Sequence, residues 1–569
     1  MKPFAKLLTT AGKNLPEIPW NVYPRPLLKR DSFFCLNGEW NLLVTKGKNT
    51  FYNGKILVPF PPESLLSGVD KTFEEGATLS YTKTFSLPYG FNRGKVILHF
   101  GAVDQFATVF FNGEKVATHE GGYTPFSVDV TPFLKTENTL QVQVVDNLSN
   151  LVLPYGKQTL KRGGMWYTPV SGIWQTVWME SVPFRYIQDV SVQVDGDQAT
   201  FTVTGVENAS ITIFPPNGEQ IKILAVKGVA SLKIPYPAYW SEQTPNLYTF
   251  TVKTDCDEVC SYFALRTLSI KEVGGLKRLC VNDKPVFFHG LLDQGYWSDG
   301  LFLPADPKEY TREILRVKEL GFNTLRKHIK IEPQLFYAEC DRLGIYVFQD
   351  MINNGDYSFL RDTLLPTFGF LKKDDTKLHT DEETRKAFLL TMQDTVELLS
   401  PHPSVCYWTI FNEGWGQFES QKCFEILKTL DSTRFIDTTS GWFRCGDSDV
   451  DSRHVYFRKY KLQKCDKPIV LSEFGGYALN TDGHVFNTQK TYGYAKCKDR
   501  QDFVNKVRSL YLEQIVPAVC KGLCGAIYTQ VSDVEDETNG IFTYDREVSK
   551  LLPQEFADIK EKLENEITK

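Results

Sequence analysis

The sequence predicts a chain of three domains: an all-β jelly roll over residues 1–180, an immunoglobulin-like β-sandwich over 181–273 and a (β/α)8 TIM barrel over 274–569. Two observations lead to this prediction. At roughly 100–200 residues per domain, 569 residues make about three domains. Short strand-like segments fill the first half of the chain, whereas strand-like and helical patterns alternate in the second half, as they do in α/β folds.

The jelly roll is predicted from short β-branched and aromatic runs that are separated by turn residues. Asn112-Gly113 joins two of these runs and is a strong hairpin signal, because both turn positions require positive φ. No amphipathic helix of useful length interrupts the block, so a jelly roll or sandwich is the simplest fold. The predicted strands are residues 96–100, 107–111, 140–145 and 175–179.

A second β block of roughly 90 residues alternates apolar and polar positions and matches the length of an immunoglobulin-like domain. Its predicted strands are residues 191–194, 199–203, 211–214 and 248–253.

The barrel is predicted from eight candidate strands with helical patterns between several of them. Two of the helices have a proline near the start and a glycine just after the end. No helical pattern lies between Ser440 and His454, so we expect a long functional loop there. The strands are residues 286–291, 323–326, 346–349, 406–411, 435–438, 454–457, 469–472 and 526–530, and the helices are 307–320, 333–343, 381–400 and 499–516.

Charge, hydropathy and cysteine spacing exclude several classes of function. The 64 basic and 69 acidic residues give a net charge of −5 without basic runs, so we expect no nucleic-acid partner. No apolar run approaches the roughly 20 residues of a membrane helix, so we expect no membrane segment. Residues 1–13 are too polar for a signal-peptide core, which predicts a cytoplasmic location unless a leader has been removed. The 12 cysteines include no Cys-x-x-Cys pair, and we predict no disulfide.

Two glutamates that follow predicted barrel strands indicate the chemistry. Glu413 follows the strand at 406–411, and Glu473 follows the strand at 469–472. Because the carboxyl ends of barrel strands meet at one mouth, the two side chains can meet there although 60 residues separate them. Glycoside hydrolysis needs such a pair, one a protonated acid and the other an ionised nucleophile. For either glutamate alone, a helix cap or an ion pair is the alternative.

Five motifs occur in the order found in one enzyme family. They are residues 163–174, Phe288-His289-Gly290, Thr324-Leu325-Arg326-Lys327-His328, Phe411-Asn412-Glu413-Gly414-Trp415 and Leu471-Ser472-Glu473-Phe474-Gly475-Gly476. In these motifs the chain resembles glycoside hydrolase family 2, which includes β-galactosidases, β-glucuronidases and β-mannosidases. The resemblance covers nearly the whole chain, in the family's order of jelly roll, immunoglobulin-like sandwich and barrel.

The resemblance implies a retaining exo-β-glycosidase that forms a covalent glycosyl-enzyme. It implies that Glu413 is the general acid/base and that Glu473 is the nucleophile. Asn412 would bind the sugar 2-hydroxyl, and Arg326 would keep the nucleophile ionised, with a structural ion pair inside the barrel as the alternative for Arg326. Tyr456 stands where the family has a tyrosine that contacts the nucleophile.

Further aromatic and histidine side chains are candidates for lining the substrate pocket. His289 and His328 would form hydrogen bonds to the sugar or to a carboxylate, and the alternative is a structural role. Trp297, Trp415 and Trp442 are candidate stacking platforms, since pyranose C–H faces pack well on aromatic rings; for each of them, core packing is the alternative.

The sequence gives one clue to the identity of the sugar, namely the absence of a cation at a position where related enzymes have one. Family members that act on glucuronides use an Asn-x-Lys motif after strand eight, and the matching residues 538–542 have Ile541 in place of the lysine. A buried substrate carboxylate without a cation is costly. We therefore expect β-galactosides, the commonest substrates of the family, and keep β-glucuronides or related uronides as the alternative if Arg444, Arg458 or Lys459 supplies the charge.

The predicted ligand is a small-molecule or oligosaccharide β-glycoside. Asp293 and Asp299 are expected either to bind sugar hydroxyls or to cap their loop. We expect no cofactor and no essential metal, because the sequence shows no distinct acidic cluster and no glycine-rich phosphate loop. A homo-oligomer is a mild expectation by analogy with the family. A carbohydrate-binding protein without turnover and a scaffold for a protein partner are the competing classes.

Overall fold

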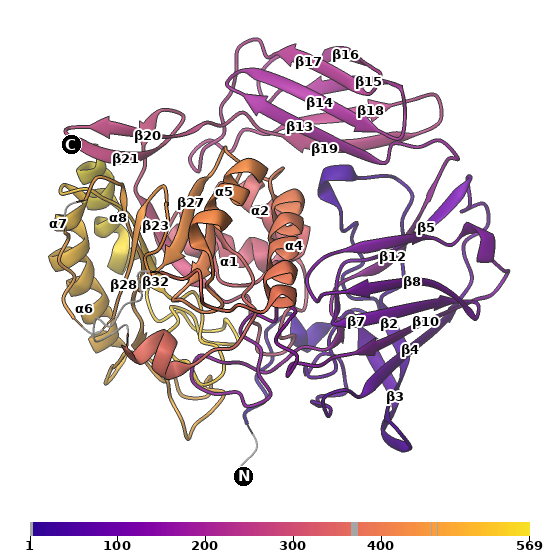
Figure 1. Cartoon of the computed structure of the whole chain (residues 1–569), viewed down its shortest axis with the longest axis horizontal. Helices are drawn as coiled ribbons and strands as arrows, with labels where there is room; N and C mark the ends of the chain where they lie inside the picture. The colour runs from indigo at the N-terminus through magenta and orange to yellow at the C-terminus, as the bar shows by residue number, and fades with distance from the viewer. Residues whose placement is uncertain (1–3, 366–373, 457, 464, 569) are drawn as a thin grey trace.

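The computed structural model describes residues 4–365, 374–456, 458–463 and 465–568. Three bodies follow one another along the chain (Figure 1): the first has indigo and purple strands, the second has magenta strands, and the third combines strands with helices. The three predicted architectures are confirmed. The predicted boundaries at residues 180 and 273 stay predictions.

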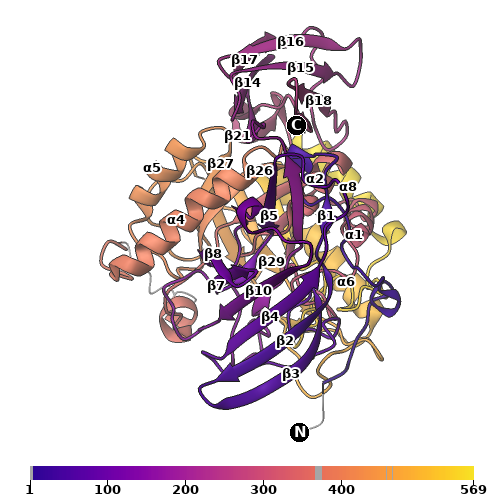
Figure 2. The ribbon, with the colours of Figure 1, turned by 90° about the vertical axis from the view of Figure 1, so that its right-hand side faces the viewer.

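The first body is a jelly roll of two main antiparallel sheets. The smaller sheet has the order β1 (Phe34–Cys35), β12 (Val177–Val182), β5 (Lys95–Phe100) and β9 (Phe126–Asp129). The larger sheet, whose strands lie side by side in Figure 2, has the order β3 (Asn49–Val58), β2 (Gly38–Lys46), β4 (Thr78–Phe85), β10 (Asn138–Val145), β7 (Phe106–Phe111) and β8 (Glu114–Glu120). Short elements complete it: β6 (Val103–Asp104), β11 (Gly172–Ile173) and the 3₁₀ helices η1 (Gly12–Asn14), η2 (Pro26–Leu28) and η3 (Thr131–Phe133).

The jelly roll encloses an apolar core between its sheets. Along β2, Trp40, Leu42 and Val44 are buried and alternate with exposed residues, as expected for a sheet with one face on a core. Asn112 and Gly113 form the predicted hairpin turn between β7 and β8, with φ of 53° and 92°. All four strands predicted here correspond to observed strands, namely β5, β7, β10 and β12.

The second body has seven antiparallel strands that fold into two layers. Phe201 on β14 packs against Phe250 on β18 and Phe263 on β19, with ring centroids 5.2 and 5.4 Å apart, so β14 faces those strands across the core. The four predicted strands are present. The strand order is β13 (Asp189–Asp195), β14 (Gln198–Thr204), β17 (Val229–Lys233), β16 (Ile221–Val226), β15 (Asn208–Phe214), β18 (Tyr248–Lys253) and β19 (Glu258–Phe263).

A small three-stranded sheet joins this sandwich to the barrel and spans the predicted boundary at residue 273. It consists of β20 (Leu268–Val273), β21 (Leu276–Val281) and β22 (Lys284–Pro285). Leu279 and Val281 of β21 belong to the same apolar cluster as Phe288 and Phe348 of the barrel interior. The small sheet therefore helps to close the amino-terminal end of the barrel.

The third body is a barrel of eight parallel strands, and all eight were predicted. They follow the order β27 (Phe435–Ser440), β26 (Val405–Asn412), β25 (Tyr346–Asp350), β24 (Thr324–Lys327), β23 (Phe288–Asp293), β32 (Leu523–Thr529), β29 (Ile469–Gly475) and β28 (Asp451–Val455). The first and last strands of this order meet through side chains, since Ser440 Oγ of β27 lies 3.1 Å from Ser452 Oγ of β28. Two short strands, β30 (Tyr477–Ala478) and β31 (Ala495–Lys496), pair outside the barrel.

Helices surround the barrel, and the four predicted ones are present. They are α1 (Lys308–Glu319), α2 (Gln334–Leu343), α4 (Glu382–Leu399) and α6 (Arg500–Leu510), the last continuing through the π-helix η5 (Tyr511–Ile515) into α7 (Val516–Val519). The layer also contains η4 (Phe359–Leu364), α5 (Ser420–Leu430) and α8 (Pro553–Ile567). Residues 441–450 connect β27 to β28 without a helix, as predicted.

Two further expectations can be compared with the structure. Among the described residues, no helix is both long and apolar enough to cross a bilayer. None of the 12 cysteines, all of which lie in the described ranges, is joined in a disulfide. The cytoplasmic location and the homo-oligomer stay predictions.

Candidate active site

Glu413 and Glu473 meet at the carboxyl-terminal mouth of the barrel. Glu473 is the fifth residue of β29, and Glu413 directly follows β26. One carboxylate oxygen of each, together with Nδ1 of His454, lies within 4.8 Å of the others. The carboxyl groups of retaining glycosidases are about 5–5.5 Å apart, whereas inverting enzymes separate them by about 6.5–9.5 Å to admit a water. The spacing here fits the retaining arrangement.

Glu473 is surrounded by hydrogen-bond donors. Arg326 NH1 donates to Glu473 Oε1 at 3.1 Å, and the Tyr456 hydroxyl donates to Glu473 Oε2 at 2.5 Å. Burial raises the pKa of this carboxyl, but the neighbouring His454 and Arg326 and the hydrogen bond from Tyr456 outweigh burial and hold the pKa below its usual value. Glu473 is therefore ionised at neutral pH, which is the state a nucleophile needs.

Arg326 connects the site through four acceptors. Its Nε donates to Asp350 Oδ1 at 2.9 Å, its NH2 to Asn412 Oδ1 at 2.9 Å, and its NH1 to the carbonyl of Ser472 at 3.0 Å in addition to Glu473. The side chain is only 1% exposed. Arg326 forms an ion pair inside the barrel with Asp350 and also contacts Glu473. The structure is thus compatible with both roles considered for Arg326, the structural ion pair and the contact with the predicted nucleophile.

Glu413 lies in a tight turn at the end of β26. Its φ of 53° is in the left-handed region, which costs a non-glycine residue free energy on the order of 1 kcal/mol. The turn is held by the Glu413 N–H, which donates to the carbonyl of Ser440 at 2.8 Å, and by Gly414, where a Cβ would come within 2.2 Å of Phe443. The Glu413 side chain is 17% exposed, compared with 6% for Glu473, so Glu413 is the more accessible of the two.

His454 and Asp350 are site residues that the sequence did not single out. His454 Nδ1 lies 2.7 Å from Glu413 Oε1 and 3.5 Å from Glu473 Oε2. Asp350 accepts hydrogen bonds from both Arg326 and His328. A signal existed for each, since both are polar residues at the carboxyl end of a barrel strand, β28 or β25.

His328 directly follows β24, at the carboxyl-terminal end of the barrel. Its Nδ1 is 2.7 Å from Asp350 Oδ2, and burial lowers its pKa although Asp350 opposes the shift. Trp442 packs edge-on against His454, with ring centroids 5.7 Å apart. Trp415 is 3% exposed and packs on Trp166 with centroids 5.0 Å apart, so core packing accounts for it.

Three family models match successive parts of the chain. "Glycosyl hydrolase 2 galactose-binding domain-like" matches residues 65–153, "Glycosyl hydrolases family 2" matches 185–266, and "Glycosyl hydrolases family 2, TIM barrel domain" matches 272–555. The chain belongs to glycoside hydrolase family 2.

Curated relatives in this family carry two different activities in their names. The chain is 25% identical over 451 residues to a β-galactosidase of Priestia megaterium, covering 71% of this chain and 41% of the relative. It is 24% identical over 458 residues to the β-glucuronidase of Homo sapiens, covering 68% of this chain and 66% of the relative. The chain spans about two fifths of the length of the first curated relatives, 39% for the β-galactosidase of Thermoanaerobacter pseudethanolicus.

Solved structures of family 2 proteins share the whole fold. A β-D-glucuronidase of Dictyoglomus thermophilum superposes with a TM-score of 0.72 at 19% identity, covering 95% of this chain and 98% of that one. A β-galacturonidase of Eisenbergiella tayi bound to galacturonate has a TM-score of 0.66 at 18% identity, with coverage of 95% and 98%. At this identity the likeness concerns the fold.

The placement of His289 at the pocket is wrong, because its side chain points away from the mouth. The ring packs among the helices with its centroid 4.2 Å from Phe322 and 5.7 Å from Phe556. Its Nδ1 donates to the carbonyl of Gly321 at 3.1 Å, and burial lowers its pKa to about 3. His289 is therefore a structural, neutral histidine of the strand–helix layer.

Asp293 and Trp297 do not line the mouth either. Asp293 is buried, accepts from Lys327 Nζ at 2.5 Å and from the Gly295 N–H at 2.8 Å, and so takes the loop-capping role that was its alternative. Trp297 is fully buried, and the Arg546 guanidinium lies 4.2 Å from its ring centroid, so it has no open face for a sugar. Asp299 also has a structural role, because its Oδ2 accepts a hydrogen bond from the Thr9 N–H at 2.8 Å.

Within the described ranges, Glu413, His454 and Glu473 are the one group of three His, Cys, Asp or Glu side chains with donor atoms this close together. Hydrogen bonds from Arg326 and Tyr456 already occupy Glu473, and the Arg326 guanidinium supplies the positive charge. This donor set suits proton transfer. The expectation that the protein needs no metal stays a prediction.

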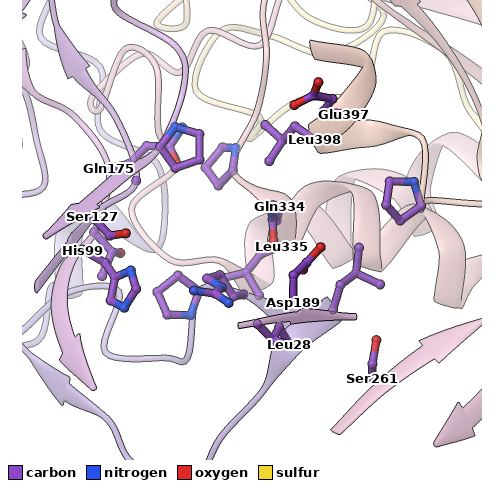
Figure 3. A pocket seen from close by; sticks show the side chains of 18 of the residues that line it. Leu28, His99, Ser127, Gln175, Asp189, Ser261, Gln334, Leu335, Glu397 and Leu398 are labelled. Atoms are coloured by element: carbon purple, nitrogen blue, oxygen red, sulfur yellow. The ribbon is translucent and has the colours of Figure 1, made fainter. Parts of the chain in front are cut away.

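A separate cavity lies where the three bodies meet. Its volume is about 590 Å³, and neither glutamate lines it. Figure 3 shows side chains from each body around it: His99 and Gln175 from the jelly roll, Asp189 from the sandwich, and Gln334 and Leu398 from the barrel. The chemistry at Glu413 and Glu473 is therefore not located in this cavity.

Removing the Tyr456 hydroxyl tests the electrostatics of Glu473. In Tyr456→Phe, the ionised carboxylate loses one hydrogen bond, so the low-pH limb of kcat/KM for an aryl β-glycoside should move to higher pH by about one unit. The matched control is Tyr460→Phe, because the Tyr460 hydroxyl has no hydrogen-bond partner among the described residues. A low-pH limb that stays in place or moves to lower pH in Tyr456→Phe would contradict this account of Glu473.

Proposed function

We propose that the protein is a retaining exo-β-glycosidase that hydrolyses terminal β-linked hexopyranosides, with Glu473 as nucleophile and Glu413 as general acid/base. The single observation that carries the proposal is the meeting of the two carboxylates within 4.8 Å at the barrel mouth. Their different surroundings support distinct roles. Glu473 accepts hydrogen bonds from the charged Arg326 and the neutral Tyr456. For the Glu413 side chain, the hydrogen-bonding neighbour found among the described residues is His454.

In the first step, Glu473 attacks the anomeric carbon while Glu413 gives its proton to the glycosidic oxygen that leaves. The bond from that oxygen to the sugar breaks, and a covalent glycosyl–Glu473 ester forms. Asn412 is oriented for this step, since its Oδ1 accepts from Arg326 at 2.9 Å and its Nδ2 is left to donate to the sugar 2-hydroxyl. That hydrogen bond strengthens as positive charge develops on the sugar ring.

In the second step, Glu413 takes a proton from water, and the resulting hydroxide attacks the anomeric carbon from the side the leaving group vacated. Glu473 leaves as a carboxylate, to which the hydrogen bonds from Arg326 and Tyr456 return. Two inversions give net retention of configuration. Because Arg326 and Tyr456 stabilise the free carboxylate by hydrogen bonds, Glu473 is a good leaving group.

The roles of the two glutamates are tested by paired variants. Glu473→Gln and Glu413→Gln should each lower kcat for an aryl β-galactoside by about 10³-fold or more, since one loses the nucleophile and the other the proton donor. Azide should restore turnover in Glu413→Gly with retained stereochemistry and yield an inverted glycosyl azide in Glu473→Gly.

The matched control for these variants is Glu397→Gln, an exposed glutamate on α4 that should keep normal turnover. Near-normal turnover in both Glu413→Gln and Glu473→Gln would sink the proposal. Sugar binding without hydrolysis by the wild-type protein, measured by titration calorimetry, would support the alternative of a carbohydrate-binding protein.

For the sugar we propose β-galactosides. Relatives named β-galactosidase support this choice, and so does the lack of a cation at the positions considered from the sequence. Ile541 is fully buried in the apolar core, Arg444 pairs with Asp451 at 3.1 Å, and Arg458 and Lys459 are exposed.

A second candidate is a β-uronide, and one side chain of the jelly roll favours it. Lys157 is half-buried, and its Nζ lies 5.6 Å from the ring centroid of Trp166, which packs on Trp415 next to the acid/base turn. Its charge lowers the pKa of His328 at the mouth, after burial, which is the larger cause. No hydrogen-bond or ion-pair acceptor for this Nζ is found in the described part of the chain, so a substrate carboxylate could serve as one.

A panel of nitrophenyl β-glycosides decides between the two sugars: galactoside, glucuronide, galacturonide, mannoside and fucoside. A galactosidase should hydrolyse the galactoside best and keep its kcat/KM within a few-fold in Lys157→Met. A uronidase should prefer a uronide and lose about 10²-fold of kcat/KM for it in Lys157→Met, because the carboxylate loses its charge partner. Lys161→Met, at an exposed lysine of the same loop, is the control that should change neither activity.

A further inference from the structure

The loop after β32 stands across the barrel from the acid/base. In the circular order of the eight strands, β32 and β26 are four places apart in either direction, so they lie on opposite sides of the barrel. Asn412 ends β26 and Glu413 follows it, whereas Gln530 and Glu537 belong to the loop after β32. A sugar whose C1 and C2 are held at Glu413 and Asn412 therefore directs its other end, C4 to C6, toward this loop.

Glu537 is connected to the nucleophile by a short series of contacts. The Tyr456 hydroxyl, which donates to Glu473, lies 2.9 Å from Thr529 Oγ1 at the end of β32. Gln530 is the next residue, and its Nε2 donates to Glu537 Oε2 at 3.2 Å. The Glu537 carboxylate is therefore held at the carboxyl-terminal end of the barrel, on the same side as Glu473.

Glu537 and the acid/base are also near one shared side chain, Tyr492. Burial is the largest cause of the raised pKa of Tyr492, and the charges of Glu537 and Glu413 add to it. The backbone of Tyr492 pairs with the loop after β32, since the Thr538 N–H donates to the Tyr492 carbonyl at 3.2 Å. The half-buried Tyr492 thus lies within the electrostatic reach of both carboxylates.

The Glu537 carboxylate has a fixed orientation. The Tyr167 hydroxyl and Gln530 Nε2 both donate to its Oε2, and the hydrogen bonds found for this carboxylate among the described residues go to that oxygen. Oε1 therefore retains the capacity to accept. Glu537 is only 3% exposed, so its charge acts in a confined space where electrostatic interactions are stronger than in bulk water.

A cation of the jelly roll lies near Glu537. The Lys157 carbonyl accepts from the Tyr167 N–H at 3.1 Å, and the Tyr167 hydroxyl reaches Glu537. Burial raises the pKa of Glu537, whereas the hydrogen bond from Tyr167 and the charge of Lys157 lower it, so both neighbours favour the ionised carboxylate. Glu535 of the same loop is paired differently, with Arg162 at 3.1 Å. The charge of Lys157 is therefore partly offset by Glu537 before any substrate binds.

We propose that Glu537 determines the sugar specificity: its Oε1 accepts a hydrogen bond from a sugar hydroxyl at C4 or C6, and its negative charge disfavours a carboxylate there. The proposal rests on the proposed glycosidase function. A hydroxyl can donate to a carboxylate, whereas the carboxylate of a uronide can only accept and would bring two negative charges together. The site therefore selects neutral hexopyranosides over uronides, although Lys157 is nearby.

Removing the charge of Glu537 at nearly constant shape tests the proposal. In Glu537→Gln, kcat/KM for a nitrophenyl β-galactoside should fall about 10-fold, because a charge-assisted hydrogen bond becomes a neutral one. For the β-galacturonide, which differs from the galactoside only at C6, kcat/KM should rise about 10-fold, since a negative charge is replaced by an amide that can donate. A variant that merely folds poorly would lower both values, so opposite changes identify a contact with the sugar.

A β-fucoside, which lacks the 6-hydroxyl of the galactoside, identifies the hydroxyl that is bound. If Glu537 binds the 6-hydroxyl, the wild-type protein should hydrolyse the fucoside about 10-fold less efficiently than the galactoside, and Glu537→Gln should not change the fucoside value. If Glu537 binds the 4-hydroxyl, the fucoside should lose as much activity in Glu537→Gln as the galactoside does. A fucoside that equals the galactoside in the wild-type protein and is insensitive to the variant overturns the proposal.

The matched control is Glu535→Gln. Glu535 is 2% exposed, belongs to the same loop and accepts from the Thr168 N–H at 2.9 Å. This variant should leave the ratio of galactoside to galacturonide hydrolysis unchanged. An unchanged ratio in Glu537→Gln, or a wild-type protein that prefers the galacturonide, overturns the proposal. A wild-type protein that hydrolyses no β-glycoside would instead remove the proposed function, which separates the two failures.

Binding to the wild-type protein gives a second readout that needs neither turnover nor a variant. In titration calorimetry at neutral pH, galactose should bind about 10-fold more tightly than galacturonate, because only the neutral sugar can donate to Glu537 without charge repulsion. Tighter binding of galacturonate overturns the proposal even if Glu537→Gln does not fold.

Discussion

The burial of one guanidinium inside the barrel constrains the whole site. Arg326 is only 1% exposed, and an unpaired charge at that depth would cost several kcal/mol. Its charge is matched by Asp350 and Glu473, and two further hydrogens are donated to Asn412 and to the carbonyl of Ser472. The same contacts that stabilise the buried Arg326 charge therefore keep one carboxylate ionised and orient the amide beside it.

The barrel gives its two carboxylates opposite surroundings although they are neighbours. Glu473 belongs to a strand and receives donors from β24 and from the segment after β28. Glu413 lies in a strained turn, and among the described residues the hydrogen-bonding neighbour found for its carboxylate is His454. Closure of the barrel between β27 and β28 runs through serines, and these hydroxyls reach His454 Nε2. The same few hydroxyl groups therefore join the two ends of the barrel sheet and contact the histidine that lies between the glutamates.

Much of the fold and of the site was predictable, and the failures have two origins: the face of a strand on which a residue lies, and the position at which a strand begins. Composition and periodicity predicted eight strands and two glutamates at their ends, because strand ends are marked by a change from apolar to polar residues. They did not say which face of a strand a residue occupies. Phe288 packs inside the barrel and His289, one residue later, points to the helices, as alternation along a strand requires. His454 was missed because the sixth strand was predicted to begin at residue 454, whereas it spans Asp451–Val455.

The central claim is that Glu413 and Glu473 act as a retaining pair across the barrel mouth. The most direct test is the stereochemistry of the first sugar that the wild-type protein releases, followed by ¹H NMR in the minutes before mutarotation. The account predicts that an aryl β-glycoside yields the β-anomer first. Release of the α-anomer as the first product would mean a single displacement by water and would contradict it.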